Sequence, residues 1–264
     1  MAAAQYREYP VPPAVMPFIT CIWSLEGDGA PRERILPDGC VELVFHFRDQ
    51  FCTHFANGKS SMQPESFVVG QMNRFIEIEP RGRIGFVAVR FNARGAYRFL
   101  PGSLKAAASA VVDVADIWKT SYREWGDSIA SATTMSNRVA TVEALLFQML
   151  RSGRGPDAIV DRALQLIAAH FGELKIASIA SQIGTSEREL GRRFENSVGL
   201  SPKQFSRVYR FRHALHRLRT KRPENLTETA VACGYYDQAH FNHEFRELTG
   251  IAPGELFKRS DLVY

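Results

Sequence analysis

An internal repeat in the C-terminal half of the chain constrains the fold more than any other feature of the sequence. The segment 176–205 aligns with the segment 226–256 once a single residue is inserted within the unit. The matched positions carry residues of the same kind: Ala180 with Ala230, Gly184 with Gly234, Leu190 with Phe241, Phe194 with Phe245, Gly199 with Gly250, and Pro202 with Pro253. Two copies are too few for a solenoid, so the pattern indicates a duplicated supersecondary unit.

Each copy has the pattern of a helix-turn-helix, in which a glycine ends a short helix and a tight turn leads into a second one. In the first copy Ser186 and Glu189 form a capping-box pattern, and in the second copy Asp237 is the expected N-cap. Apolar pairs four residues apart, such as Phe241 and Phe245, are expected to face the core. The caps and the pairs together predict which side chains of each second helix point outward.

The predicted outward faces carry the residue types that read DNA. They are Arg188, Gly191, Arg192 and Glu195 in the first copy, and Gln238, Ala239, Asn242, His243 and Arg246 in the second. Arginine can bond guanine bidentately, glutamine and asparagine can bond adenine, and small side chains allow close approach in the major groove. A solvated face explains any single run of this kind, but the duplicated pattern favours DNA binding.

A basic helix is predicted between the two copies. Ser201 is a plausible N-cap, Pro202 suits the first helical position, and the helix can extend to about Arg219. The stretch from residue 188 to residue 222 holds eleven Lys or Arg against two Glu, while the whole chain has a net charge of +5. We therefore expect the positive charge to gather at the DNA-binding surface, with Arg207 and other arginines of this helix partly serving phosphates.

Residues 156–257 closely resemble the DNA-binding domain of the AraC/XylS family of bacterial transcription regulators. The resemblance lies in "GTSERELGRRFENSVGLSPKQF", "YRFRHALHRL" and "ACGYYDQAHFNHEFRELTGIAP". It implies two helix-turn-helix units joined by a linker helix, with promoter DNA as the partner and RNA polymerase as a further one if the protein is an activator. By position, it assigns base reading to Arg188, Gly191, Arg192, Gln238, Ala239, Asn242 and His243.

The first hundred residues have the pattern of a β-rich domain. Runs of β-branched and aromatic residues at 40–47, 66–72, 74–80 and 84–91 are separated by turn sequences, which favours a small barrel or sandwich. Helices are expected near 95–100, 111–118 and 137–151, and "RSGRGPD" at 151–157 is the best linker candidate. The expected fold is α+β with two domains, 1–152 and 153–264.

The N-terminal segments "ILPDGCVELVFHF" and "GFVAVRFNARGAYRFL" resemble the cupin-like domain of a subgroup of these regulators. The resemblance implies a β-barrel that senses a small molecule or mediates dimerisation. The strand pattern suggests pocket residues, with ordinary core or surface positions as the alternative for each: Trp23, Phe45, His46, Arg90 and Phe91. The apolar stripe of the helix at 137–151 fits either a homodimer contact or packing on the chain's own barrel.

The alternative function is that of a metal-dependent cupin enzyme fused to a DNA-targeting module. Such an enzyme needs three or four His or Glu ligands, and the candidate segment "HFRDQFCTH" offers only His46 and His54 with two neighbouring cysteines. No phosphate-binding loop or catalytic triad pattern is present. The sequence therefore favours a regulator without enzymatic activity, cofactor or metal.

The remaining features favour a cytoplasmic protein. The cysteines at 21, 40, 52 and 233 form no C-x-x-C pair, as expected for reduced thiols. The N-terminus lacks the pattern of a signal peptide, and no apolar run reaches the roughly 18 to 20 residues that span a bilayer. We therefore expect neither secretion nor membrane insertion.

Overall fold

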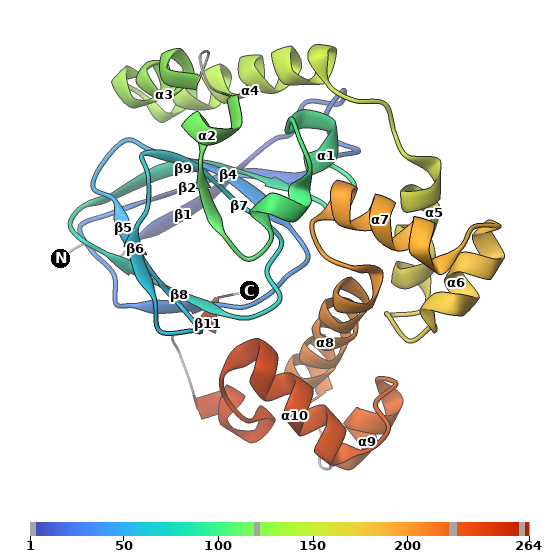
Figure 1. Cartoon of the computed structure of the whole chain (residues 1–264). Helices are drawn as coiled ribbons and strands as arrows, with labels where there is room; N and C mark the ends of the chain where they lie inside the picture. The colour runs from blue at the N-terminus through green and yellow to red at the C-terminus, as the bar shows by residue number, and fades with distance from the viewer. Residues whose placement is uncertain (1–3, 119–121, 222–225, 259–261, 264) are drawn as a thin grey trace.

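The computed structural model describes residues 4–118, 122–221, 226–258 and 262–263. It divides into a β-rich part with helices on one side and a helical part formed by the C-terminal half (Figure 1). The first β-sheet has the order β1-β2-β9-β4-β7-β10 and the second has the order β11-β3-β8-β5-β6. Both are antiparallel except at the pair of β11 with β3.

The strands of the first sheet are β1 (Gln5–Tyr9), β2 (Ile19–Gly27), β4 (Val41–His46), β7 (Ser66–Val69), β9 (Ile84–Phe91) and β10 (Val111–Asp113). Those of the second are β3 (Glu33–Ile35), β5 (Phe51–Phe55), β6 (Ser60–Met62), β8 (Ile76–Pro80) and β11 (Leu262–Val263). The predicted strand at 66–72 ends earlier, at Val69. The next residue, Gly70, lies so close to η1 that a Cβ there would lie 1.8 Å from the carbonyl oxygen of Ala107. The prediction of a helix over 111–118 was wrong at its start, where Val111–Asp113 pairs with β7.

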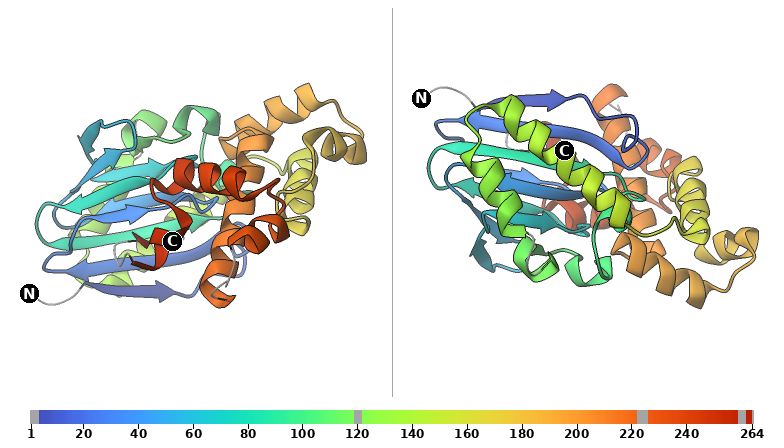
Figure 2. Two further views of the ribbon diagram at one scale, coloured as in Figure 1. Left: turned by 90° about the horizontal axis from the view of Figure 1, so that it is seen from below. Right: turned by 90° about the horizontal axis from the view of Figure 1, so that it is seen from above.

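Helices cover the outer face of the first sheet. After α1 (Ala96–Phe99), η1 (Leu104–Ala107) and α2 (Val114–Trp118), the helices α3 (Tyr122–Ser131) and α4 (Met135–Ser152) lie across the strands (Figure 2). The apolar stripe of α4 is buried with residues of this sheet in one cluster: Val139, Val142, Leu145, Leu146 and Met149. The chain's own sheet thus covers the stripe that was considered for a homodimer contact.

The helical part begins after an extended segment, since α4 ends at Ser152 and the next helix starts at Ala158. Its helices are α5 (Ala158–Ala169), α6 (Ile176–Ile183), α7 (Glu187–Val198), α8 (Pro202–Lys221), α9 (Leu226–Ala232) and α10 (Gln238–Thr249), followed by η2 (Pro253–Lys258). One buried cluster joins all six α-helices. The predicted duplicated unit is therefore observed as α6–α7 and α9–α10, joined by α8.

The two parts contact each other at several places. Leu36, from the loop after β3, is buried in the core of the helical part. The Arg34 guanidinium donates to the carbonyl oxygen of Thr249 over 2.9 Å at the end of α10. Lys105 pairs with Glu195 of α7 over 2.6 Å. The N-terminal part thus touches both helix-turn-helix units.

Candidate nucleic-acid interface

The helix α7 starts at the N-cap that its sequence predicts, and a glycine ends it. Ser186 Oγ accepts a hydrogen bond from the Glu189 amide over 3.2 Å, and Gly199 ends the helix in the left-handed conformation with φ of 98°. Leu190 and Phe194 are fully buried beneath it. Because these anchors fix the rotation of the helix, Arg188 and Arg192 lie on its exposed side.

The side chains of α7 form their own ion pairs. Arg192 donates to both carboxylate oxygens of Glu189, at 2.9 and 2.8 Å, and Arg193 bonds Glu189 at 2.6 Å and Asp157 at 3.2 Å. These hydrogen bonds hold the pKa of the Glu189 carboxyl down at about 2. Arg192 is exposed, so its ion pair with Glu189 is weak. The guanidinium can therefore leave Glu189 and bond a DNA base instead. Gly191, half-buried and without a side chain, leaves room for close approach.

The helix α10 repeats this construction. Asp237 Oδ1 accepts from the His240 amide over 2.7 Å, and Gly250 closes the helix in the left-handed conformation. Phe241 and Phe245 are fully buried with ring centroids 5.6 Å apart. The N-cap and the aromatic pair were predicted, and they fix the rotation of α10.

The predicted reading residues of α10 differ in exposure. Ala239, His243 and Arg246 are exposed, whereas Gln238 and Asn242 are half-buried. Gln238 Oε1 accepts from the Thr227 hydroxyl over 2.7 Å. Asn242 Oδ1 is buried and has no hydrogen-bond partner among the described residues.

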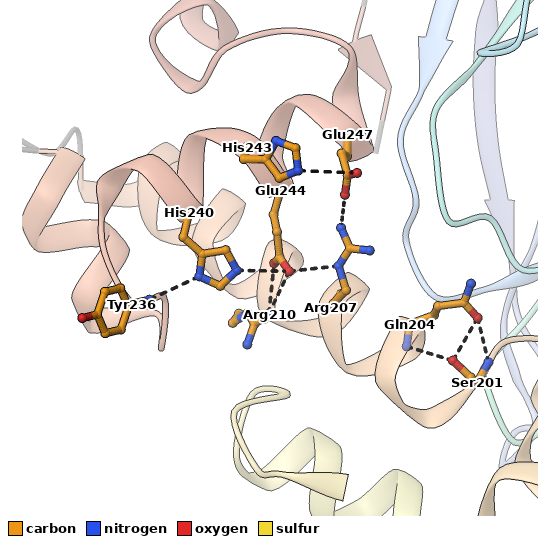
Figure 3. A network of polar contacts seen from close by, with 9 residues as sticks. All are labelled: Ser201, Gln204, Arg207, Arg210, Tyr236, His240, His243, Glu244 and Glu247. Carbon is orange, nitrogen blue, oxygen red and sulfur yellow. Dashed lines mark hydrogen bonds and ion pairs between the residues drawn. The ribbon is translucent and has the colours of Figure 1, made fainter.

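A network of ion pairs that the sequence did not predict joins α8 to α10 (Figure 3). Glu244 accepts from Arg207 Nε over 2.9 Å and from Arg210 Nη2 over 3.0 Å, and its side chain is only 8% exposed. Arg207 also pairs with Glu247. Arg207 therefore faces α10 in the protein without DNA, and its expected contact with phosphate stays a prediction. The available signal was the place of Glu244 beside Phe241 and Phe245 on the buried side.

Comparison with known proteins agrees with this geometry. Residues 160–259 match a protein-family model described as a helix-turn-helix domain. The HTH-type transcriptional activator RhaS of Klebsiella pneumoniae (strain 342) is 28% identical over 140 residues, 49% of this chain and 50% of RhaS. An AraC-type regulator from Chromobacterium violaceum is 28% identical over 37% of this chain and 87% of that chain, with a TM-score of 0.34. Residues 160–259 are therefore similar to the helix-turn-helix domain of AraC-type regulators.

Outside residues 160–259 the similarities are less specific. Residues 7–113 match a family model described as a domain of unknown function (DUF6597). The structure of ToxT from Vibrio cholerae with a bound unsaturated fatty acid aligns with 89% of this chain and 93% of the ToxT chain. The sequence identity is 12% and the TM-score is 0.45. The chain spans about half the length of the curated relatives it matches.

The N-terminal part of the protein contains a cavity of about 100 Å³ between its two sheets. Three of the five predicted pocket residues line it: Trp23, His46 and Arg90. Arg90 Nε donates to Glu42 over 2.8 Å, and the guanidinium carbon lies 5.5 Å from the centre of the Trp23 ring. Burial raises the pKa of the Glu42 carboxyl, against the effect of Arg90.

The other two predicted pocket residues, Phe45 and Phe91, do not line this cavity. Both are buried in the cluster beneath α3 and α4, on the opposite face of the sheet. Successive residues of a strand point to opposite faces. His46 and Arg90 therefore face the cavity, and their neighbours face the helices.

The two histidines considered as metal ligands bind different partners. His46 Nε2 lies 3.0 Å from Gln63 Oε1, while His54 bonds Ser60 Oγ at 2.7 Å and Glu79 at 3.0 Å. Burial lowers the pKa of His46, which favours a neutral imidazole. Within the described ranges no group of three or more His, Cys, Asp or Glu is placed to hold a metal ion.

Proposed function

We propose that the protein is a sequence-specific DNA-binding transcription regulator that responds to a small molecule. The observation that carries the proposal is the pair of capped helices α7 and α10, each with a buried apolar side and exposed side chains suited to base recognition. The match of residues 160–259 to a helix-turn-helix domain supports it. By analogy with the activator RhaS, activation through RNA polymerase is the proposed mode.

Each second helix would enter a major groove. The 20 residues of α8 give a length of about 30 Å, which suits two reading helices near one turn of DNA apart, about 34 Å. Arg188 and Arg192 would bond guanine, Gln238 and Asn242 would bond adenine, and Ala239 would contact a thymine methyl group. His243 and Arg246 complete the proposed contact set on α10.

The effector would bind in the cavity of the N-terminal barrel, beside Trp23, His46 and Arg90. Leu36 supports a route from this cavity to the DNA-binding part, because it lines the cavity and is also buried in the helical core. A ligand that moves Leu36 would therefore disturb the packing beneath α8. We assign residues 1–152 to this sensor with its helical connector and residues 153–264 to DNA binding.

We further propose that the protein works in the cytoplasm and is not an enzyme. Among the described residues no helix is long and apolar enough to cross a membrane. A homodimer would need a surface other than the stripe of α4, which the sheet already covers.

The test is selection of binding sites from random duplex DNA at physiological salt, with the full chain and two variants. Arg192→Ala should relax the preference at one base position of an enriched motif that has two half-sites about one helical turn apart. Arg151→Ala changes an exposed arginine of α4 and should leave the motif unchanged. Enrichment of no motif, with and without cell-derived small molecules, would refute the proposal.

A further inference from the structure

The short helix η1 of the N-terminal part packs against the C-terminal end of α7, the first of the two proposed reading helices. The Ser103 hydroxyl donates to Asn196 Oδ1 over 2.8 Å, and Lys105 Nζ lies 2.6 Å from Glu195 Oε2. Gly199, which ends α7, lies so close to η1 that a Cβ there would be 3.1 Å from a carbonyl oxygen of η1. A hydrogen bond, an ion pair and a close backbone approach thus hold η1 beside α7.

The acid that Lys105 binds belongs to the outward face of α7. Glu195 follows Arg188 by seven residues, which is about 20° short of two full turns and about 10 Å along the helix axis. Arg188, Arg192 and Glu195 therefore form one row on the side opposite the buried Leu190. The N-terminal part thus reaches the end of the row that is proposed to face DNA.

The place of Lys105 is that of a phosphate-binding residue. The major groove is about 12 Å wide, so a group about 10 Å along the helix from a base-reading arginine lies near the edge of the groove, where the phosphates are. The Lys105 side chain is 66% exposed although it pairs with Glu195, and its flexible stem allows the ammonium to turn toward a phosphate. Glu195 is 31% exposed and would repel phosphate if no cation lay beside it.

We propose that Lys105 is a DNA-binding residue of the N-terminal part, with its ammonium on a phosphate beside the half-site that α7 reads. This contact rests on the function proposed above, because it requires α7 to enter a major groove. A phosphate contact adds affinity and fixes position, but it carries no base preference. Displacement of η1 from α7 would withdraw this cation and leave Glu195 without it, so the position of the N-terminal part would affect DNA affinity directly.

The test measures the affinity of the full chain for a duplex of arbitrary sequence by fluorescence anisotropy at several salt concentrations. A phosphate contact needs no operator, so the result is separate from that of the DNA selection. Lys105→Gln should reduce the slope of log affinity against log salt by about 0.9, and weaken binding about three- to tenfold near 0.1 M salt. Lys59→Gln, the same charge change at an exposed position between β5 and β6, far from α7 (Figure 1), should change neither.

The variant Glu195→Gln separates a phosphate contact from simple charge compensation. It should strengthen DNA binding, because it removes an acid from the outward row and releases Lys105. With Glu195→Gln in place, Lys105→Gln should still reduce the salt slope. If Lys105→Gln had no effect on that background, Lys105 would only neutralise Glu195, and the proposal would be overturned.

Two further variants separate the contact from folding and from the packing of η1 on α7. Lys105→Arg keeps the charge and should keep the salt slope, and circular dichroism checks that each variant is folded. Ser103→Ala removes the other side-chain bond to α7 without a change of charge, so its salt slope should match that of the wild type. Equal losses in Ser103→Ala and Lys105→Gln would overturn the proposal. An enriched motif together with an unchanged salt slope in Lys105→Gln would also overturn it, and would leave the proposed function intact.

Discussion

The carboxylate of Glu244 offers a sharp test of how the second helix-turn-helix unit is held. Its side chain is 8% exposed and accepts from Arg207 and Arg210, which are 29% and 15% exposed. In Glu244→Gln the amide keeps one acceptor oxygen but loses the negative charge that two largely buried guanidinium groups share, and it places an NH2 donor beside them. Removal of one partner from a buried pair costs about 3 to 5 kcal/mol. We expect about 3 kcal/mol here, because Arg207 keeps Glu247.

The matched control is Glu247→Gln. Glu247 lies on α10, like Glu244, and pairs with Arg207 of α8, but the Glu247 side chain is 35% exposed. Loss of its charge should therefore lower the free energy of unfolding by less than about 1 kcal/mol. Urea unfolding followed by far-ultraviolet circular dichroism compares the two variants. Hydrogen exchange of the α9 and α10 amides shows whether the loss is local to the second unit, as the contacts require.

Base recognition gives an independent readout for the same variants. If Glu244 sets the angle of α10 against α8, Glu244→Gln should weaken the preference at the half-site read by α10 and keep the preference at the half-site read by α7. Equal stability of the two variants, or equal loss at both half-sites, would refute the reasoning.

Four further outcomes test other parts of the structure. Arg192→Ala should cost about 1 to 3 kcal/mol at one base position, measured by competition between operator variants. Leu190→Ala, at a fully buried site, should destabilise the first unit by about 2 to 5 kcal/mol; an unchanged unfolding midpoint would contradict its place in the core. The pKa of His46 is lowered in the folded chain, so below about pH 6.5 the histidine takes up a proton more readily in the unfolded chain than in the folded one. The free energy of unfolding should therefore decrease as the pH falls below about 6.5. His46→Phe should remove this pH dependence from unfolding curves measured between pH 7 and 5. Arg34→Ala should increase hydrogen exchange at the end of α10, because it removes the bond to Thr249.

The elements of the DNA-binding part could be predicted because their signals are local. Ser186 and Asp237 cap their helices as expected. Ser201 Oγ accepts from the Gln204 amide over 3.2 Å, and α8 starts at Pro202. Each of these signals lies within four residues of the boundary it sets, so no tertiary information was needed.

The side of the sheet to which each residue of the central strands points was harder to predict, because both sides of the sheet are covered by protein. In β4 and β9 nearly every residue is buried, so hydrophobic alternation is absent and Phe45 could be placed on the wrong side. The polar residues Glu42, His46 and Arg90 were the useful signal, since they share the cavity face. For the contact of Arg207 with Glu244, the local pattern places the Glu244 carboxylate on the buried side of α10 but does not identify its partner on α8.

The helix α8 explains how events in the sensor can reach the second reading helix. Arg210 on one face binds the buried Glu244 of α10. Arg212, two residues on, lines a cleft between α8 and the N-terminal part, together with Asp38 and Cys40. A helix transmits rotation about its axis as a nearly rigid body, because its backbone hydrogen bonds fix successive residues. A shift of the sensor wall against Arg212 would therefore move Arg210 together with the carboxylate that orients α10. The first unit is reached separately, through Lys105 and Glu195, so the two half-sites can respond differently to the same ligand.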